Sequence, residues 1–145
     1  MTENDCPLID SNVLIYAYDE TESEKHKKAK EIMNLAWSKQ RVLALSTQNL
    51  SEFFSVITTK VQKPIELKMA FRIISDISYF SSFKIFKFST REILDAILFV
   101  EKFKIDYWDA LIAAVMYKNN IHTIITENEQ DFKKIPWLKV INPFK

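Results

Sequence analysis

Short apolar runs alternate along the chain with longer stretches in which apolar residues recur at helical spacing. The short runs predict five strands, over residues 6–9, 41–45, 83–88, 123–126 and 138–141. The longer stretches predict helices over residues 12–18, 21–40, 46–61, 64–77, 89–100 and 106–119. Strands separated by helices pair in parallel through crossover connections, so this order indicates an α/β fold with a mostly parallel sheet covered on both faces.

Local signals mark several helix starts and buried stripes. Thr21 to Glu24 and Ser89 to Glu92 have the spacing of capping boxes, and Asp106 is expected to cap the helix that follows it. Helical spacing also predicts buried stripes in four helices: Ala29, Ile32, Met33, Ala36 and Trp37; Leu50, Phe53, Phe54, Ile57 and Val61; Leu67, Ala70, Phe71, Ile74 and Ile77; Ile93, Ile97, Leu98 and Val100.

Composition bounds the class of protein. A chain of 145 residues, 48% of them hydrophobic, fits a single domain over residues 1–145. The 20 basic and 19 acidic side chains nearly cancel, so a nucleic acid would have to be held locally and not by overall charge. Cys6 is the only cysteine, which excludes a disulfide framework, and the absence of glycine excludes the Gly-rich loops that bind nucleotides.

No secretory signal opens the chain, because the first residues are acidic and Asp10 interrupts the apolar run after them. No apolar stretch approaches the ~20 residues that cross a bilayer. We therefore expect a cytoplasmic protein without a membrane segment.

Three acids interrupt apolar or helical stretches, and they are the candidate functional residues. Asp10 directly follows the first strand, Glu52 lies in the early turns of a helix, and Asp109 is followed by an apolar run. A carboxylate at the edge of a core is costly unless it is paired or coordinates a metal, so the three predict one shared site for Mg²⁺ or Mn²⁺. Simpler roles stay open: Asp10 as a helix cap, Glu52 as a solvated residue near a helix start, and Asp109 in a first turn.

Other chemistry has less support. The turn over residues 126–132 follows the fourth strand, where ligands bind in parallel sheets, but spacing does not decide which of its polar groups points to the site. His26 and His122 lack metal-ligand spacing. Ser11 and Ser46 have no identifiable histidine partner for nucleophilic catalysis.

Four segments together resemble the signature blocks of PIN domains, and the closest resemblance is to VapC-type toxins of toxin–antitoxin pairs. The segments are DSNVLIY at residues 10–16, SEFF at 51–54, WDALIAA at 108–114 and IITENEQDF at 124–132. Their order and spacing match over essentially the whole chain. The resemblance implies a three-layer α/β/α sandwich, RNA as substrate, a small antitoxin protein as partner and a homodimer.

The resemblance also assigns roles to residues. Asp10, Glu52 and Asp109 would be the acids that hold one or two divalent ions and cut RNA. Ser11 and Asn12 would orient Asp10, and Thr126 would position the last turn. Many members have an acid two residues after that threonine; this chain has Asn128 there, with Asp131 next in reach, so the fourth acidic position is left open.

Two alternative functions remain open. A phosphatase using Asp10 as phosphoryl acceptor fits poorly, because Asn12 stands where such enzymes usually have a second aspartate. A PIN-fold RNA-binding module with weak or lost catalysis gains weight from Asn128. Metal-dependent RNA cleavage by the purified protein would separate these readings.

Overall fold

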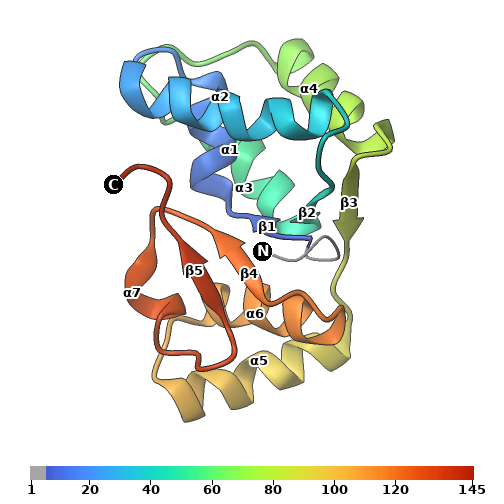
Figure 1. Ribbon diagram of the computed structural model, residues 1–145, viewed down its shortest axis with the longest axis vertical. Helices are drawn as coiled ribbons and strands as arrows, with labels where there is room; N and C mark the ends of the chain where they lie inside the picture. Colours follow the sequence, from blue (N-terminus) through green and yellow to red (C-terminus); the bar gives the residue numbers. More distant parts are fainter. Residues whose placement is uncertain (1–5) are drawn as a thin grey trace.

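Five parallel strands form one sheet in the computed structural model, which describes residues 6–145 (Figure 1). The strands are β1 (Leu8–Ile9), β2 (Leu43–Ser46), β3 (Phe83–Phe86), β4 (Thr123–Ile125) and β5 (Lys139–Ile141). Their order is β3-β2-β1-β4-β5, and every pairing is parallel. The short strand β1 is therefore central, between β2 and β4. The predicted mostly parallel sheet is confirmed.

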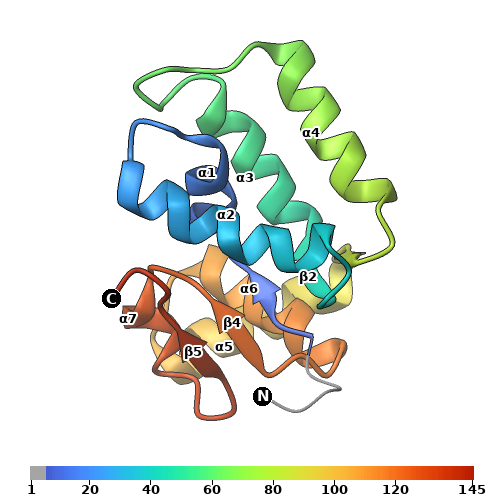
Figure 2. The same cartoon turned by 45° about the horizontal axis from the view of Figure 1, so that its top comes forward.

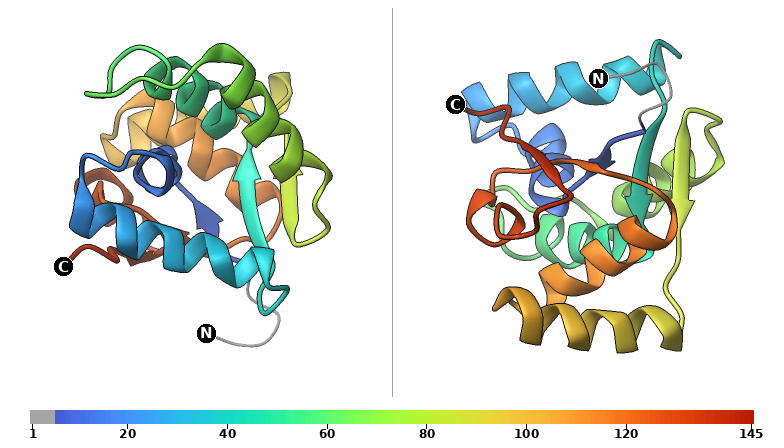
Figure 3. Two further views of the ribbon diagram at one scale, coloured as in Figure 1. Left: turned by 90° about the horizontal axis from the view of Figure 1, so that it is seen from above. Right: turned by 60° about the horizontal axis from the view of Figure 1, so that its bottom comes forward.

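Helices cover both faces of this sheet, as Figures 2 and 3 show. One layer holds α1 (Ser11–Tyr18), α2 (Ser23–Trp37), α3 (Thr47–Ile57) and α4 (Leu67–Tyr79); the other holds α5 (Thr90–Phe103) and α6 (Tyr107–Lys118). A short helix that the sequence pattern did not predict, α7 (Glu129–Phe132), lies near α6 and β5. The predicted α/β/α sandwich is thus confirmed. No helix of the described chain is long and apolar enough to cross a bilayer.

Strand residues alternate between two separate cores. Ile9 of β1 packs with α1–α4, whereas its neighbour Leu8 packs with α5 and α6. The same alternation places Leu45 and Ala44 of β2 in different cores. Successive side chains of a strand point to opposite faces, so a sheet covered on both sides reads as a continuous apolar run.

Several residues of the predicted buried stripes are exposed. Phe54 is 41% exposed, Leu67 64%, Phe71 76%, Ile97 52% and Leu98 61%. Ala70 and Ile77 of the predicted α4 stripe are buried, together with Ile73, and the buried residues of α5 are Glu92 and Ala96. Val61 lies beyond the end of α3. Both α4 and α5 carry apolar residues on more than one side, and periodicity alone does not tell which side faces the core.

Helix caps follow the prediction at two of three positions. Ser89 and Glu92 form the predicted capping box of α5, and the Asp106 carboxylate accepts from the Trp108 N–H at 3.0 Å. The predicted box at Thr21 is wrong: α2 begins at Ser23, and the Thr21 hydroxyl donates to Asp19. The N-cap position of α2 is Glu22, so Thr21 lies one residue before the position from which a side chain caps the helix.

We expect Glu92→Ala to destabilise the protein by about 1–2 kcal/mol, because Glu92 is a buried carboxylate with several donors. Its Oε1 accepts from the Ser89 N–H at 3.0 Å and from Lys118 Nζ on α6 at 3.3 Å. These donors hold the pKa of Glu92 below its usual value although burial opposes them. The stabilisation is therefore present above the unfolded-state pKa and is lost as the pH falls through the lower folded-state pKa.

Urea unfolding at pH 7 and pH 3 measures this effect. The exposed Glu66 at the start of α4 makes no capping hydrogen bond, so Glu66→Ala is the matched control and should cost little. Equal losses in the two variants would contradict the assigned role of Glu92.

Candidate active site

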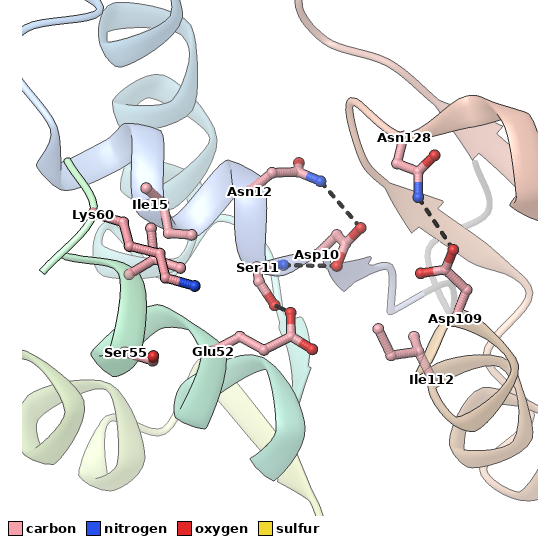
Figure 4. Close-up of a pocket in the computed structure, with 11 residues that line it drawn as sticks. Asp10, Ser11, Asn12, Ile15, Glu52, Ser55, Lys60, Asp109, Ile112 and Asn128 are labelled. Carbon is pink, nitrogen blue, oxygen red and sulfur yellow. Dashed lines mark hydrogen bonds between the residues drawn. The ribbon is translucent and has the colours of Figure 1, made fainter. Parts of the chain in front are cut away.

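The candidate residues meet at the edge of the sheet where β1, β2 and β4 end. A cavity of about 360 Å³ opens there (Figure 4). All three predicted acids line it, and the complete lining consists of Asp10, Ser11, Asn12, Ile15, Glu52, Ser55, Val56, Lys60, Asp109, Ile112 and Asn128. Parallel strands present their carboxyl ends at one edge, which is where α/β sheets bind ligands.

Asp10 is the most buried of the three acids, at 5% exposed. It caps α1, since its Oδ1 accepts from the Ser11 N–H at 2.8 Å. Its Oδ2 accepts from the Thr126 hydroxyl at 2.7 Å and from Asn12 Nδ2 at 3.1 Å. Burial raises the pKa of Asp10 despite these donors, and the charge of Glu52 adds to the rise. Asp10 therefore both caps α1 and lines the cavity.

Asn12 and Thr126 tie the end of β1 to the turn after β4. Asn12 Nδ2 also donates to Thr126 Oγ1 at 3.2 Å, and Asn12 Oδ1 accepts from the Glu127 N–H at 3.1 Å. Thr126 Oγ1 in turn accepts from the Asn128 N–H at 2.9 Å. This network fixes the Asp10 carboxylate relative to the turn that carries Asn128.

Glu52 is held by a donor on each carboxylate oxygen. The Ser11 hydroxyl donates to Oε2 at 2.7 Å, and Gln48 Nε2 donates to Oε1 at 3.0 Å. Ser11 Oγ accepts from Asn49 Nδ2 at 3.1 Å, and Gln48 Nε2 also donates to the Trp108 carbonyl at 3.0 Å. Ser11 thus donates its hydroxyl to Glu52 and its backbone N–H to Asp10, and Gln48 connects α3 to the start of α6.

Asp109 faces Asp10 across the cavity from the first turn of α6 (Figure 4). Asn128 Nδ2 donates to its Oδ2 at 3.2 Å. Partial burial raises the pKa of Asp109 to about 7, with further contributions from a hydrogen bond with Asp131 and from the charges of Asp10, Asp131 and Asp106. Such crowding of carboxylates disfavours their ionised forms until a positive charge compensates them.

The two residues considered for the fourth acidic position lie differently. Asn128 lines the cavity, whereas Asp131 is not part of the lining. Asp131 Oδ2 accepts from the Asp106 N–H at 3.1 Å, and its Oδ1 lies 3.6 Å from Lys134 Nζ. The Asp131 carboxylate therefore interacts with Asp109 from outside the cavity, and Asn128 is the one of the two residues that lines the cavity.

The donor set fits a hard divalent cation that keeps much of its water. Within residues 6–145 no three His, Cys, Asp or Glu side chains are arranged to hold a metal ion by themselves. Asp10 and Asp109 nevertheless face one cavity, and the raised pKa of both means that a cation between them would relieve their repulsion. Mg²⁺ is commonly bound by one or two carboxylates with water and substrate phosphate as its other ligands.

Sequence reasoning missed Gln48, Asn49 and Lys60. Gln48 lies four residues before Glu52, a spacing at which helical side chains meet, so this contact had a detectable signal. Asn49 also closes the capping box of α3 with Ser46. Lys60 lies beyond the end of α3, where no periodicity predicts its direction. Its amine points toward the side of the cavity that holds Ser11 and Glu52 (Figure 4).

Comparisons with known proteins agree on one fold. The family model described as PIN domain matches residues 8–138. The VapBC2 structure from Rickettsia felis, bound to a promoter DNA fragment, is 22% identical with a TM-score of 0.66, covering 94% of this chain and 98% of that one. VapBC-1 from nontypeable Haemophilus influenzae is 17% identical with a TM-score of 0.66, covering 97% and 99%.

A third similar structure is Mycobacterium tuberculosis VapC20, described as a sarcin-ricin loop cleaving toxin. It is 17% identical with a TM-score of 0.62, covering 81% of this chain and 85% of that one. At these identities the solved structures establish a shared fold. No curated protein sequence matches the chain.

Proposed function

Because the chain belongs to the PIN-domain family, whose model spans residues 8–138, we propose that it is a divalent-metal-dependent endoribonuclease and the toxin of a toxin–antitoxin pair. The observation that carries the nuclease proposal is the pair of carboxylates, Asp10 and Asp109, that face one cavity at the carboxyl edge of the sheet. Carboxylates that face one another in a partly buried cavity are costly to keep ionised without a positive charge to compensate them.

The proposed reaction is hydrolysis of an RNA phosphodiester. Asp10 and Asp109 would hold Mg²⁺ or Mn²⁺, which when bound lowers the pKa of a water and offsets charge on the leaving oxygen. The water oxygen forms a bond to phosphorus while the bond to the 3′-oxygen breaks. Glu52 accepts the proton of this water, and solvent returns a proton to the leaving 3′-oxygen.

The surrounding residues have positioning roles in this proposal. Ser11 and Gln48 aim the Glu52 carboxylate by donating to its two oxygens. Asn12 and Thr126 aim Asp10. Preorganised donors of this kind need no rearrangement during the reaction, which is the main source of rate enhancement in many active sites.

An antitoxin partner and a cytoplasmic site of action complete the proposal. A similar structure from Klebsiella pneumoniae is described as a toxin–antitoxin complex, and those from Rickettsia felis and nontypeable Haemophilus influenzae are named VapBC2 and VapBC-1. An RNA-cleaving toxin would need a partner that holds it inactive in the compartment where RNA is made.

A second candidate is a PIN-fold module that binds RNA without cutting it. The observation that favours it is Asn128, an uncharged amide where a fourth acid would strengthen the cation site. This module would bind RNA equally well with and without a divalent ion.

Incubation of purified protein with structured and single-stranded RNA tests the proposal. We expect cleavage with Mg²⁺ or Mn²⁺, none in a chelator, and products ending in 5′-phosphate and 3′-hydroxyl. Metal-independent binding without any cleavage would favour the RNA-binding module. Cleavage that persists in excess chelator would reject the proposed chemistry.

We expect Lys60→Ala to raise the KM for RNA by about three- to tenfold with a smaller change in kcat, because an exposed lysine beside the cavity contacts a phosphate of the bound strand. Among residues 6–145, Lys60 is the only cationic side chain in the cavity lining, and it faces a set of acids that would otherwise repel RNA. Lys60→Arg should keep most of the affinity. Steady-state kinetics at two salt concentrations measures the effect.

The matched control is Lys63→Ala, since Lys63 is exposed on the same loop but does not line the cavity. The lysine at position 60 has no special role if both alanine variants change KM to the same degree.

A further inference from the structure

We propose that a second cavity, directly beside the active-site cavity, binds a guanine base of the RNA strand next to the bond that is cut. This second cavity has a volume of about 320 Å³ and is lined by α1, the loop after it, and the end of α3 with its following loop. It continues the active-site cavity, because both are lined by Asn12, Ile15, Val56 and Lys60. The inference rests on the proposed function in taking RNA as the ligand.

The shared residues place the second cavity on the path of a bound strand. In Figure 4, Ile15 and Lys60 lie on the side of the active-site cavity away from Asp109. A strand that leaves the active-site cavity on this side enters the second cavity past Lys60. Lysine binds phosphate as a point charge, so Lys60 contacts the phosphate between the two nucleotides.

Part of the second cavity is apolar. Ile15, Val56 and Val61 contribute half-buried side chains from α1, α3 and the loop after α3. Apolar side chains of this kind contact the flat face of an unstacked base, while polar groups read its edge by hydrogen bonds. The volume is at the small end of the range for ligand sites, as suits a single base.

The buried acceptor of the second cavity is Asp19, which is 8% exposed. Its Oδ1 accepts from the Thr21 N–H at 3.1 Å and from the Thr21 hydroxyl at 2.5 Å, and these bonds fix the turn. Its Oδ2 accepts no hydrogen bond from any residue of the described range 6–145. The turn therefore uses one oxygen of Asp19, and the other is costly to bury unless a ligand donates to it.

A second acceptor lies three residues further along the same loop. Glu22 occupies the N-cap position of α2, but its side chain makes no capping hydrogen bond. Like Asp19, it lines the second cavity. An ionised carboxylate only accepts hydrogen bonds, so the ligand that suits Asp19 and Glu22 together has to offer N–H donors.

Guanine is the RNA base that fits this pair of acceptors. Its Watson–Crick edge carries two adjacent N–H donors, the ring N1–H and the 2-amino group. Adenine and cytosine have one amino donor beside a ring nitrogen lone pair, and uracil has one N–H between two carbonyls. Each of these bases would bring a lone pair against a carboxylate oxygen, and such mismatched polar groups discriminate strongly between ligands.

Binding of short RNA strands in EDTA tests the guanine site in the absence of cleavage. The probes are uridine-rich oligonucleotides that differ at one central position, which holds guanosine, inosine or adenosine. Inosine lacks only the 2-amino group of guanosine. We expect the wild type to bind the guanosine strand about tenfold more tightly than the inosine strand, because one hydrogen bond to a charged acceptor is lost. The adenosine strand should bind no better than the inosine strand. Fluorescence anisotropy measures the three affinities.

Asp19→Asn should abolish the preference for guanosine, because the amide keeps Oδ1 for Thr21 and places an N–H group where guanine needs an acceptor. Glu22→Gln changes an exposed residue and should reduce the preference about threefold. Each preference is a ratio of two affinities measured on one preparation, so it does not depend on how much of the variant is folded. The matched control is Glu20→Gln, which should keep the full preference, since Glu20 is exposed on the same loop but does not line the second cavity.

Cleavage of the same strands in Mg²⁺ then places the guanine site relative to the active site. We expect one cut at a fixed bond next to the guanosine. Equal binding of the guanosine and inosine strands by the wild type would overturn the proposal, as would a preference that survives Asp19→Asn or cuts scattered along the strand. Cleavage without any base preference would reject the guanine site and leave the nuclease proposal intact. A guanosine preference without cleavage would support the guanine site and reject the nuclease proposal.

Discussion

We expect Asp109→Asn to reduce RNA cleavage by about a thousandfold or more and, in the same protein, to raise the stability of the metal-free fold. Activity falls because Asp109 is one of the two carboxylates that face the proposed cation, and the amide cannot share its charge. Stability rises because Asp109 sits beside Asp10, Asp106 and Asp131, whose charges contribute to its pKa of about 7. A structural residue would show the opposite pattern, with activity and stability falling together.

The stability gain should depend on pH in a defined direction. The carboxyl of Asp109 has a higher pKa in the folded protein than in the unfolded chain, so protonation favours the fold at low pH. That advantage is lost as the pH rises from about 4 to about 7, and Asn does not titrate. In excess chelator the variant should thus equal the wild type in stability near pH 4 and exceed it by about 1–2 kcal/mol above pH 7, allowing for solvent screening at this partly buried site.

Asp106→Asn is the matched control for this variant. It removes a charge three residues away, and asparagine caps a helix nearly as well as aspartate. We expect it to keep most of the activity. Urea unfolding in EDTA from pH 4 to pH 8, together with cleavage rates in saturating Mg²⁺, measures both effects. Near wild-type turnover in Asp109→Asn would show that the cation site has been assigned to the wrong residues.

The second large effect is stabilisation of the wild type by Mn²⁺. A cation that binds only the folded state adds RT ln(1 + [L]/Kd), which is about 2.7 kcal/mol at a hundred times Kd. For a domain of this size we expect a rise of about 5–10 °C in Tm. Asp10→Asn should lose most of this rise, because Asp10 is the most buried carboxylate of the cavity.

The relevant quantity for Asp10→Asn is the difference between its melting temperatures with and without Mn²⁺. The absolute value will also change, since an amide nitrogen at the place of Oδ2 would face the donors Thr126 and Asn12. Asp19 is a buried acid outside the cavity, so Asp19→Asn should keep the full Mn²⁺ response. An unchanged Tm of the wild type up to millimolar Mn²⁺ would count against a cation held by the protein alone.

Most of the fold was predictable because its signals are local. Five short apolar runs gave the five strands, and Ser89, Glu92 and Asp106 marked helix starts by capping chemistry. The buried sides of α4 and α5 were not predictable, because both helices carry apolar residues all around and only tertiary packing selects the buried side. The helix α7 is one turn long, which is too short for any periodicity.

The acidic residues of the candidate site could be proposed from the sequence, but the hydrogen bonds that hold them could not. Asp10, Glu52 and Asp109 stood out because each is an acid in an apolar or helical context, and the structure brings them to one cavity. Spacing could not show that Ser11 donates to Glu52 or that Asn128, and not Asp131, reaches the cavity. Those contacts join residues far apart in the chain, so they depend on the register of the folded sheet.

The central place of β1 has a consequence for the timing of activity during synthesis. Asp10 is made early, yet its hydrogen bond to Thr126 spans 116 residues, and the Thr126 N–H is itself held by the Ile141 carbonyl of β5. A growing chain therefore carries the first acid long before the groups that aim it exist. For an RNA-cutting enzyme of the kind proposed here, this order would delay a competent active site until translation of residues 8–141 is almost finished.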